Sequence, residues 1–493
     1  MVEGGYPPLG GRWRSWSPVA WEPRAVDDLA VRADGEAAVR RRPTTATLVS
    51  WAVVAVLAAV ALSGTLANDF RDRVLSADQA SFVLQAVSLA EEGDLSYGPS
   101  DIELWREVGW ADHPVGLHLQ RNDAGWAFAK PYGVSLLTAP FVAVLGAVRG
   151  VAVANSLLLV AYFAVASALL ATWFRGPAVQ LGAAALAFAS TAWVFAFPVG
   201  TDLFLAVVVG AAVLALVRGI RSASPGLVAL GTGIAAFAVS EKVTVVLVLA
   251  PVVAVALSRL GAWAPRVAVI AAGLVVFAVA VVPYWHHSDG RSVTAYGGDR
   301  YVLLGSAPFE PGSASEPQRA GTEEAFSPGF VLERAVEDPV DDLYALVTYA
   351  VGTHTGLLAF SPFALGVIVV SLSRARRLGL LAWSLLGGVL AYVALYVVVF
   401  TDNYFGGGQS IGNRYFLQIS LVTAALAGAA RMSERAVSVL AIGAGVIALV
   451  VIPHHLTRPD RALVQLSEVG TVQEWLPTEP PDISGHELFF GRG

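Results

Sequence analysis

The strongest constraint on the fold is a series of long apolar blocks, among them Trp51–Leu62, Val267–Val282 and Leu378–Phe400. Blocks of about 20 residues match the hydrocarbon thickness of a bilayer, and their number excludes a cleaved signal peptide as the explanation. Of the 493 residues, 14% are charged, whereas a soluble globular domain has roughly 25%. The sequence therefore predicts a polytopic membrane protein built from helices.

The short turns between the apolar blocks are basic. They hold Arg175, Arg218, Arg221, Arg259, Arg266, Arg374, Arg376, Arg377, Arg431 and Arg435. Positive residues in short loops mark the cytoplasmic side of a membrane protein. Two acidic stretches, 67–125 and 285–342, then fall on the outer side, and each contains eleven acidic residues. We therefore expect a multi-pass plasma-membrane protein with a cytoplasmic N-terminus and an outer C-terminus.

This assignment predicts a fold of the all-α class. The expected spans are about 46–66, 152–172, 178–198, 203–218, 226–240, 243–258, 267–284, 357–372, 378–400, 414–430 and 436–453. If the apolar segment Val134–Val148 crossed the membrane, every later basic turn would lie on the opposite side. We therefore interpret this segment as a re-entrant or juxtamembrane helix. The two short spans around Glu241 are either separate or one broken helix. We expect about 11 to 13 transmembrane helices, with further helices on the outer surface.

Three domain-level segments follow from the same pattern. Residues 1–44 form a polar tail, which we expect to be cytoplasmic and disordered. Residues 45–455 form the transmembrane domain, with outer loops at 67–131 and 285–356, and 456–493 form a short outer tail. The absence of cysteine excludes disulfides and thiolate metal sites. The histidines show no HxH or HxxxH spacing, so a divalent cation is conceivable but not favoured.

Two acids, Asp202 and Glu241, are the acidic residues between Asp123 and Asp289. Charged groups near the bilayer core cost about 2.5–3.5 kcal/mol on insertion scales, so each requires a reason. Asp202 suits the N-cap of an apolar helix, a role in a site, or both. Glu241-Lys242 either marks a helix break or presents Lys242 to a bound phosphate as a point charge.

The first outer stretch begins with a segment whose apolar positions 83, 84, 87 and 90 share one helical face. This pattern predicts an amphipathic helix on the membrane surface. Asp78 lies in its first turn, where it either compensates the helix dipole or serves as a general base. Lys130 and Tyr132, in the sequence Lys-Pro-Tyr-Gly, precede the apolar segment that does not fit the alternation.

Two later segments lead into apolar spans from the outer side. His354 opens the first, HTGLLAFSP, and Arg414 lies near the end of the second, GGGQSIGNRYF. Glycines before an arginine let backbone N–H groups approach an anion, and the guanidinium can then bind a phosphate in a bidentate manner. The alternative is a flexible loop with a snorkelling arginine.

Taken in order, the segments ADQASFVLQAVSLAEEGDL, KPYG, SEKVTVVLVLAP, HTGLLAFSP and GGGQSIGNRYF resemble the GT-C superfamily of membrane glycosyltransferases. This group contains protein O-mannosyltransferases and the bacterial aminoarabinose and galacturonic-acid transferases. The resemblance covers about residues 45–455 and implies inverting transfer of a sugar from a polyprenyl-phosphate donor at the outer face. The acceptor is a lipid, a glycan or a protein, and no nucleic acid is expected.

The resemblance also implies roles for individual residues. Asp78 would be the base that deprotonates the acceptor hydroxyl, and Asp202 would support it. Lys242 and Arg414 would hold the carrier phosphate. Further candidates for the same cavity are Lys130, Tyr132, His354 and Glu241. Many members have a second acid after the first, whereas Gln79 follows Asp78 here, which argues against a metal-dependent mechanism.

Three other functions remain compatible with the sequence. A transporter or flippase is expected to carry paired charges at the bilayer midplane, whereas the unusual charges here lie at the outer rim. A polymerase or ligase of lipid-linked polymers would use similar chemistry on a polymeric acceptor. A non-catalytic relative would bind lipid or assemble an envelope complex.

Overall fold

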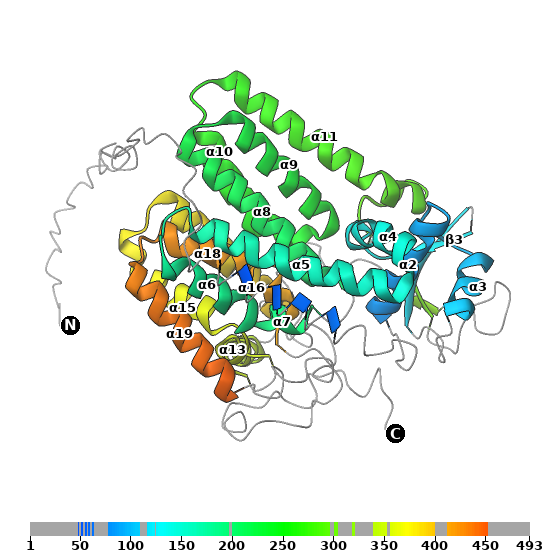
Figure 1. The fold of residues 1–493 in the computed structure, drawn as a ribbon. Coiled ribbons are helices and arrows are strands. Elements are labelled where there is room, and N and C mark those ends of the chain that lie inside the picture. Colours follow the sequence, from blue (N-terminus) through cyan, green and yellow to red (C-terminus); the bar gives the residue numbers. More distant parts are fainter. Residues whose placement is uncertain are drawn as a thin grey trace, which may run out of the picture. The chain divides into compact units, whose positions relative to one another are not determined.

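The computed structural model describes residues 77–108, 116–123, 125–196, 200–295, 300–303, 318–320, 339–352, 355–399 and 412–451, with scattered positions between 48 and 63. The predictions for both tails, for most of the first span and for His354 lie outside these residues. The described part is mainly helical, and its long helices run side by side (Figure 1).

The helices of the described part coincide with the spans expected after the first one. They are α5 (Ala147–Leu170), α6 (Pro177–Phe188), α7 (Thr191–Val194), α8 (Thr201–Ser222), α9 (Pro225–Glu241), α10 (Val246–Ser258), α11 (Trp263–His287), α14 (Leu357–Phe360), α15 (Pro362–Ser373), α16 (Leu380–Val399), α17 (Arg414–Leu417), α18 (Ser420–Ala429) and α19 (Glu434–Val451). Among the described residues, α5, α8, α11 and α16 are long and apolar enough to cross a membrane. The prediction of a helical membrane protein is confirmed.

Several expected spans are divided into two helices by polar or proline residues. Ser190 lies between α6 and α7. It caps the N-terminus of α7, because its hydroxyl accepts the Ala192 N–H at 3.1 Å. Pro362 begins α15, and a proline cannot continue the preceding helix. Lys242 has an extended backbone (φ −151°), and α9 packs on α8 and α11 while α10 packs chiefly on α16. The segments around Glu241 are therefore two separate helices.

A five-stranded antiparallel sheet, which the sequence pattern did not predict, joins the two acidic stretches. Its strands are β1 (Ser96–Tyr97), β2 (Leu117–Asn122), β3 (Gly125–Phe128), β4 (Arg300–Leu303) and β5 (Gln318–Ala320), in the order β1-β3-β2-β4-β5. The register pairs Leu119 with Tyr301 across β2 and β4. The two acidic stretches therefore meet in space.

The predicted surface helix is α2 (Ala77–Glu91), and the structure corrects its environment. Residues 80–88 of α2 are buried all round, because α3 (Pro99–Val108), β2 and α4 (Gly133–Leu145) pack against it. Its polar side chains bond within the protein instead of facing water. For example, Ser135 donates to the Gln85 side chain at 2.8 Å.

Helix α4 is the segment that did not fit the alternation of spans. It has 13 residues and lies with α2 and the sheet beside one end of α5 (Figure 1). It ends at Gly146, whose positive φ of 78° turns the chain into α5. Its 13 residues are fewer than the roughly 20 of a full span, and its place as a juxtamembrane or re-entrant helix stays a prediction. The remaining described helix, α13 (Pro339–Val351), packs on α14 and α16.

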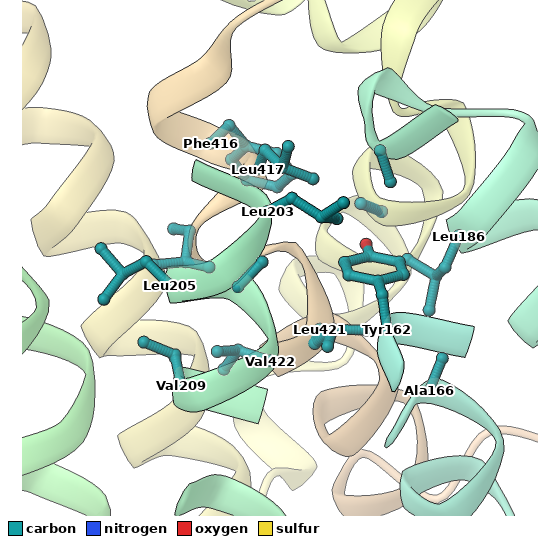
Figure 2. Packing of buried hydrophobic residues seen from close by; sticks show 14 of the residues in the cluster. Tyr162, Ala166, Leu186, Leu203, Leu205, Val209, Phe416, Leu417, Leu421 and Val422 are labelled. Atoms are coloured by element: carbon teal, nitrogen blue, oxygen red, sulfur yellow. The ribbon is translucent and has the colours of Figure 1, made fainter. Parts of the chain in front are cut away.

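The packed interior lies where α5, α8 and α18 meet (Figure 2). Its apolar side chains include Leu203, Val209, Leu421 and Val422. The Tyr162 hydroxyl is satisfied there by Ser420 at 2.6 Å, as a buried polar group requires. This packing places the start of α8 beside α17, and α17 carries part of the candidate site.

Candidate functional site

The carboxylate of Asp78 is the centre of a cluster drawn from three distant parts of the chain. Its Oδ1 lies 2.6 Å from the Lys130 Nζ and 3.6 Å from the His118 Nε2. Its Oδ2 accepts a hydrogen bond from the Arg414 Nη1 at 3.1 Å. Helix α2, the segment after β3 and the start of α17 therefore converge here. Three residues predicted from the sequence, Asp78, Lys130 and Arg414, are in direct contact.

The charges around Asp78 determine its ionisation. Burial alone would raise the pKa of Asp78, but Lys130, Arg414 and His118 outweigh burial and hold this pKa well below its ordinary value. The group is therefore a carboxylate at neutral pH. Its side chain is 27% exposed, so a ligand can still reach it.

Lys130 is fixed by contacts of its backbone and of its side chain. Its backbone carbonyl accepts a hydrogen bond from the Gln85 Nε2 at 3.1 Å, and Ser135 in turn orients the Gln85 amide. Its side chain is 8% exposed. A buried ammonium requires a counter-charge, and Asp78 supplies it.

Arg414 is positioned by the turn that begins α17. The Asn413 side chain caps this helix by accepting the Phe416 N–H at 3.1 Å. Gly412 has a φ of 69°, and a Cβ there would overlap Thr191, so glycine suits this position. The other glycines of the predicted anion-binding loop lie outside the described residues.

Lys242 contacts two tyrosine rings, one of which also contacts Arg414 of this cluster. Its Nζ lies 4.4 Å from the centroid of Tyr415 and 5.7 Å from that of Tyr396. The Arg414 Cζ lies 5.5 Å from the same Tyr415 ring. A cation over a tyrosine within about 6 Å is attracted by the ring quadrupole. The Tyr415 ring thus connects Lys242 with the cluster around Asp78.

Asp202 lies in the first turn of α8 and is buried (6% exposed). Its Oδ1 accepts a hydrogen bond from the Gln418 Nε2 at 2.6 Å, and the Tyr392 hydroxyl donates to the Gln418 Oε1 at 2.8 Å. The amide of Gln418 is oriented by both contacts. Because Gln418 follows α17 directly, Asp202 is tied to the element that carries Arg414.

Glu241 and Tyr132 belong to a neighbouring cluster around the Tyr284 hydroxyl. The Glu241 Oε2 accepts the Gly133 N–H at 2.8 Å, and its Oε1 accepts the Tyr284 hydroxyl at 2.9 Å. The Tyr132 hydroxyl donates to the Ala280 carbonyl at 2.8 Å. Glu241 thus binds the first N–H of α4, where a carboxylate is favoured.

Several residues of the site were not predicted as members of it. They are His118, Gln85, Ser135, Tyr392, Tyr396, Tyr415 and Gln418. A signal existed for some of them: Tyr392 and Tyr396 share one face of an apolar helix, four residues apart. Gln418 is a polar residue four positions after Arg414. Spacing gave no signal for Gln85, because its partners lie about 50 residues away.

The charges of the arrangement are suited to an anion. Lys130, Lys242 and Arg414 outnumber the carboxylates Asp78 and Asp202 by one charge, and the side chains are partly withdrawn from water. Electrostatic interactions are stronger in such a site than in bulk water. Within the part of the chain that the structure describes, no three His, Cys, Asp or Glu side chains are grouped as metal ligands.

No protein-family model matches the sequence, and no curated protein matches it. Among solved structures, the chain is similar to ArnT from Cupriavidus metallidurans bound to undecaprenyl phosphate, with a TM-score of 0.45 and 15% sequence identity. The match covers 81% of this chain and 63% of ArnT, so the chain spans less than two thirds of that protein. At this TM-score and identity, the likeness is a distant similarity of structure. It is too distant to assign a family or an activity.

Proposed function

We propose that the chain transfers a sugar from a polyprenyl-phosphate donor to an acceptor hydroxyl at the outer face of the membrane. The observation that carries this proposal is the contact of one carboxylate, Asp78, with the two cations Lys130 and Arg414. Such a site provides a base and a phosphate-binding pair within one hydrogen-bond length of each other. It also lies beside α4 and the sheet, among the segments expected at the outer surface.

The reaction proceeds by inverting displacement at the anomeric carbon. Asp78 accepts the proton of the acceptor hydroxyl, and the acceptor oxygen forms the new bond to the anomeric carbon. The bond between that carbon and the phosphate oxygen breaks, and the polyprenyl phosphate leaves with the electron pair. Lys130, Arg414 and Lys242 stabilise the negative charge that develops on the departing phosphate.

Binding of the donor also makes Asp78 a stronger base. In the free protein the two cations lower the pKa of Asp78, and a carboxylate with so low a pKa is a weak base. A donor phosphate that binds Lys130 and Arg414 neutralises part of their charge, so the pKa of Asp78 rises toward its ordinary range. The base therefore becomes effective when the donor is bound, and water is not activated in its absence.

The second carboxylate has a supporting role in this mechanism. Asp202 accepts from Gln418, and its charge lies at the start of α8, next to α17. Asp202 balances the excess positive charge of the site and orients α17 for Arg414. Glu241 and Tyr132 belong to the neighbouring cluster, and we propose that they support the site without contacting the carrier phosphate.

The test is sugar transfer by purified protein from radiolabelled polyprenyl-phosphate sugars, comparing wild type with Asp78→Asn. Glu103→Gln, which removes a charge from an exposed position on α3, is the matched control. We expect transfer by wild type and the control, and a loss of about 100-fold or more in Asp78→Asn. Equal transfer by all three proteins would remove Asp78 from the role of base.

Binding measured on the same variants separates the base from the binding pair. Because Asp78 competes with the phosphate for Lys130 and Arg414, we expect Asp78→Asn to bind farnesyl phosphate about 5-fold more tightly than wild type. Weaker binding would mean that Asp78 holds the cations in place for the ligand. Binding without transfer from any donor would favour a transporter or flippase instead.

A further inference from the structure

The ring of Tyr415 has two cations against it, which is an unusual environment for a buried tyrosine. Tyr415 is 8% exposed. Lys242 comes from the turn after α9, and Arg414 precedes Tyr415 in the chain. Both lie within cation–π distance of this ring. Two like charges repel each other in a weakly polar environment, so this pair is favoured when an anion lies between or beside them.

The contact leaves the ammonium of Lys242 ready to donate hydrogen bonds. Among the residues that the structure describes, the Lys242 ammonium has no hydrogen-bond or ion-pair partner, and its contacts are with the two rings. A ring face stabilises a cation by about 0.5–2 kcal/mol without engaging its N–H groups. All three donors of the ammonium therefore remain for a ligand with several acceptor oxygens, such as a phosphate.

The rings themselves are held firmly. The Tyr396 and Tyr415 centroids are 4.4 Å apart, with 31° between the ring planes. The Tyr396 hydroxyl is hydrogen-bonded to Thr244 at 3.1 Å, two residues beyond Lys242. The Tyr392 hydroxyl, which donates to the Gln418 Oε1 at 2.8 Å, also lies 3.3 Å from the Tyr415 carbonyl. The turn that carries Lys242 and the helix that carries Arg414 are thus joined through stacked rings.

We propose that Tyr415 is a positioning residue that directs Lys242 and Arg414 toward one phosphate group of the substrate. The inference rests on the proposed function, because the ligand is the phosphate of the donor carrier. Its ring acts on the substrate through the two cations. The ring contacts Lys242, and the hydroxyl is hydrogen-bonded to the Arg414 side chain. Phenylalanine therefore keeps the contact with Lys242, and leucine loses both contacts.

The test is equilibrium binding of farnesyl phosphate, with farnesol as the probe that lacks the phosphate, followed by intrinsic tryptophan fluorescence. Tyr415→Leu is expected to lower the affinity for farnesyl phosphate by about 2- to 30-fold, which corresponds to the cation–π range. Tyr415→Phe is expected to lower the affinity less than Tyr415→Leu does, since the ring remains against Lys242 and the hydrogen bond to Arg414 is lost. Farnesol binding is expected to be equal in all variants.

Two further variants separate positioning from a general packing effect. Tyr97→Leu removes a ring that is equally buried (6% exposed) from β1, and it is expected to leave farnesyl phosphate binding unchanged. In a Lys242→Met background, Tyr415→Leu is expected to lower the affinity by a smaller factor than in wild type, because its contact with Arg414 is the one left to lose. A full effect in that background would overturn the inference, as would equal loss in Tyr415→Phe.

The outcome is independent of the transfer assay. Absence of sugar transfer with intact, Tyr415-dependent phosphate binding would reject the proposed function and retain the phosphate site. Sugar transfer by wild type with no preference of the protein for farnesyl phosphate over farnesol would overturn the role of Tyr415 and retain the enzyme.

Discussion

Two carboxylates in the first acidic stretch, Asp78 and Asp101, have opposite environments. Asp78 lies among cations, which hold its pKa well below the ordinary value despite burial. Asp101 is 1% exposed, and burial, with the nearby charges of Glu92 and Asp94, raises its pKa to about 7 although the Gly98 N–H lowers it. The first group is suited to a site for anions. Asp101 has a structural role, because its Oδ2 accepts the Gly98 N–H at 2.8 Å and so caps α3.

The raised pKa of Asp101 predicts a pH-dependent stability. The folded state binds the Asp101 proton more tightly than the unfolded state, whose pKa is near 3.8. The stability contributed by the neutral acid is full below about pH 4 and is lost as the pH rises to about 7. Asp101→Asn stays neutral and can still accept the Gly98 N–H. We expect its melting temperature in detergent to exceed that of wild type increasingly from pH 5 to pH 7, and by a constant amount above. A pH-independent difference would contradict this assignment.

At the residue scale, the sequence identified the charged members of the site better than their partners. Asp78, Lys130 and Arg414 were conspicuous because charged groups near a membrane require a reason, and the structure brings them into contact. The contact between Asp78 and Arg414 joins positions 336 apart, and no local pattern encodes such a pairing. Tyr415 had no signal in the sequence either, because aromatic residues are common at the start of apolar helices.

At the element scale, apolar length predicted the helices well, and their interruptions less well. The sheet was missed because its strands are two to six residues long and β2 pairs with β4 from the other outer stretch. The burial of α2 was missed for the same reason, since the elements that cover it are not visible in its own periodicity. Amphipathic spacing shows that one face is apolar, and it does not show what covers the polar face.

The junction between α4 and α9 explains a glycine of the Lys-Pro-Tyr-Gly segment. A Cβ on Gly133 would lie 2.6 Å from the Glu241 Oε2 and 2.9 Å from the Phe204 Cε1. We expect Gly133→Ala to lower stability by about 1–3 kcal/mol, because this contact has no space for a methyl group. Thermal unfolding in detergent measures the effect.

The matched control for Gly133→Ala is Gly226→Ala in the first turn of α9. A Cβ there meets nothing within 4 Å, so alanine is expected to be neutral or slightly stabilising. Equal melting temperatures for the two alanine variants would show that α4 can move away from Glu241. The contact between Gly133 and Glu241 would then not fix the position of Lys130, which lies three residues before Gly133.

At the scale of the whole molecule, the structure joins the two acidic stretches in one sheet and places α2, which carries Asp78, beside it (Figure 1). The basic turns, including Arg218 and Arg221 in the last turns of α8, are expected on the opposite, cytoplasmic side. Because the chain contains no cysteine, single cysteines can be labelled without background. We expect a membrane-impermeant maleimide to label Ser96→Cys, in β1, in intact cells, and Ser222→Cys, at the end of α8, after permeabilisation alone. Labelling of Ser222→Cys alone in intact cells would place the site in the cytoplasm, where a donor bound from the outer face could not reach Asp78.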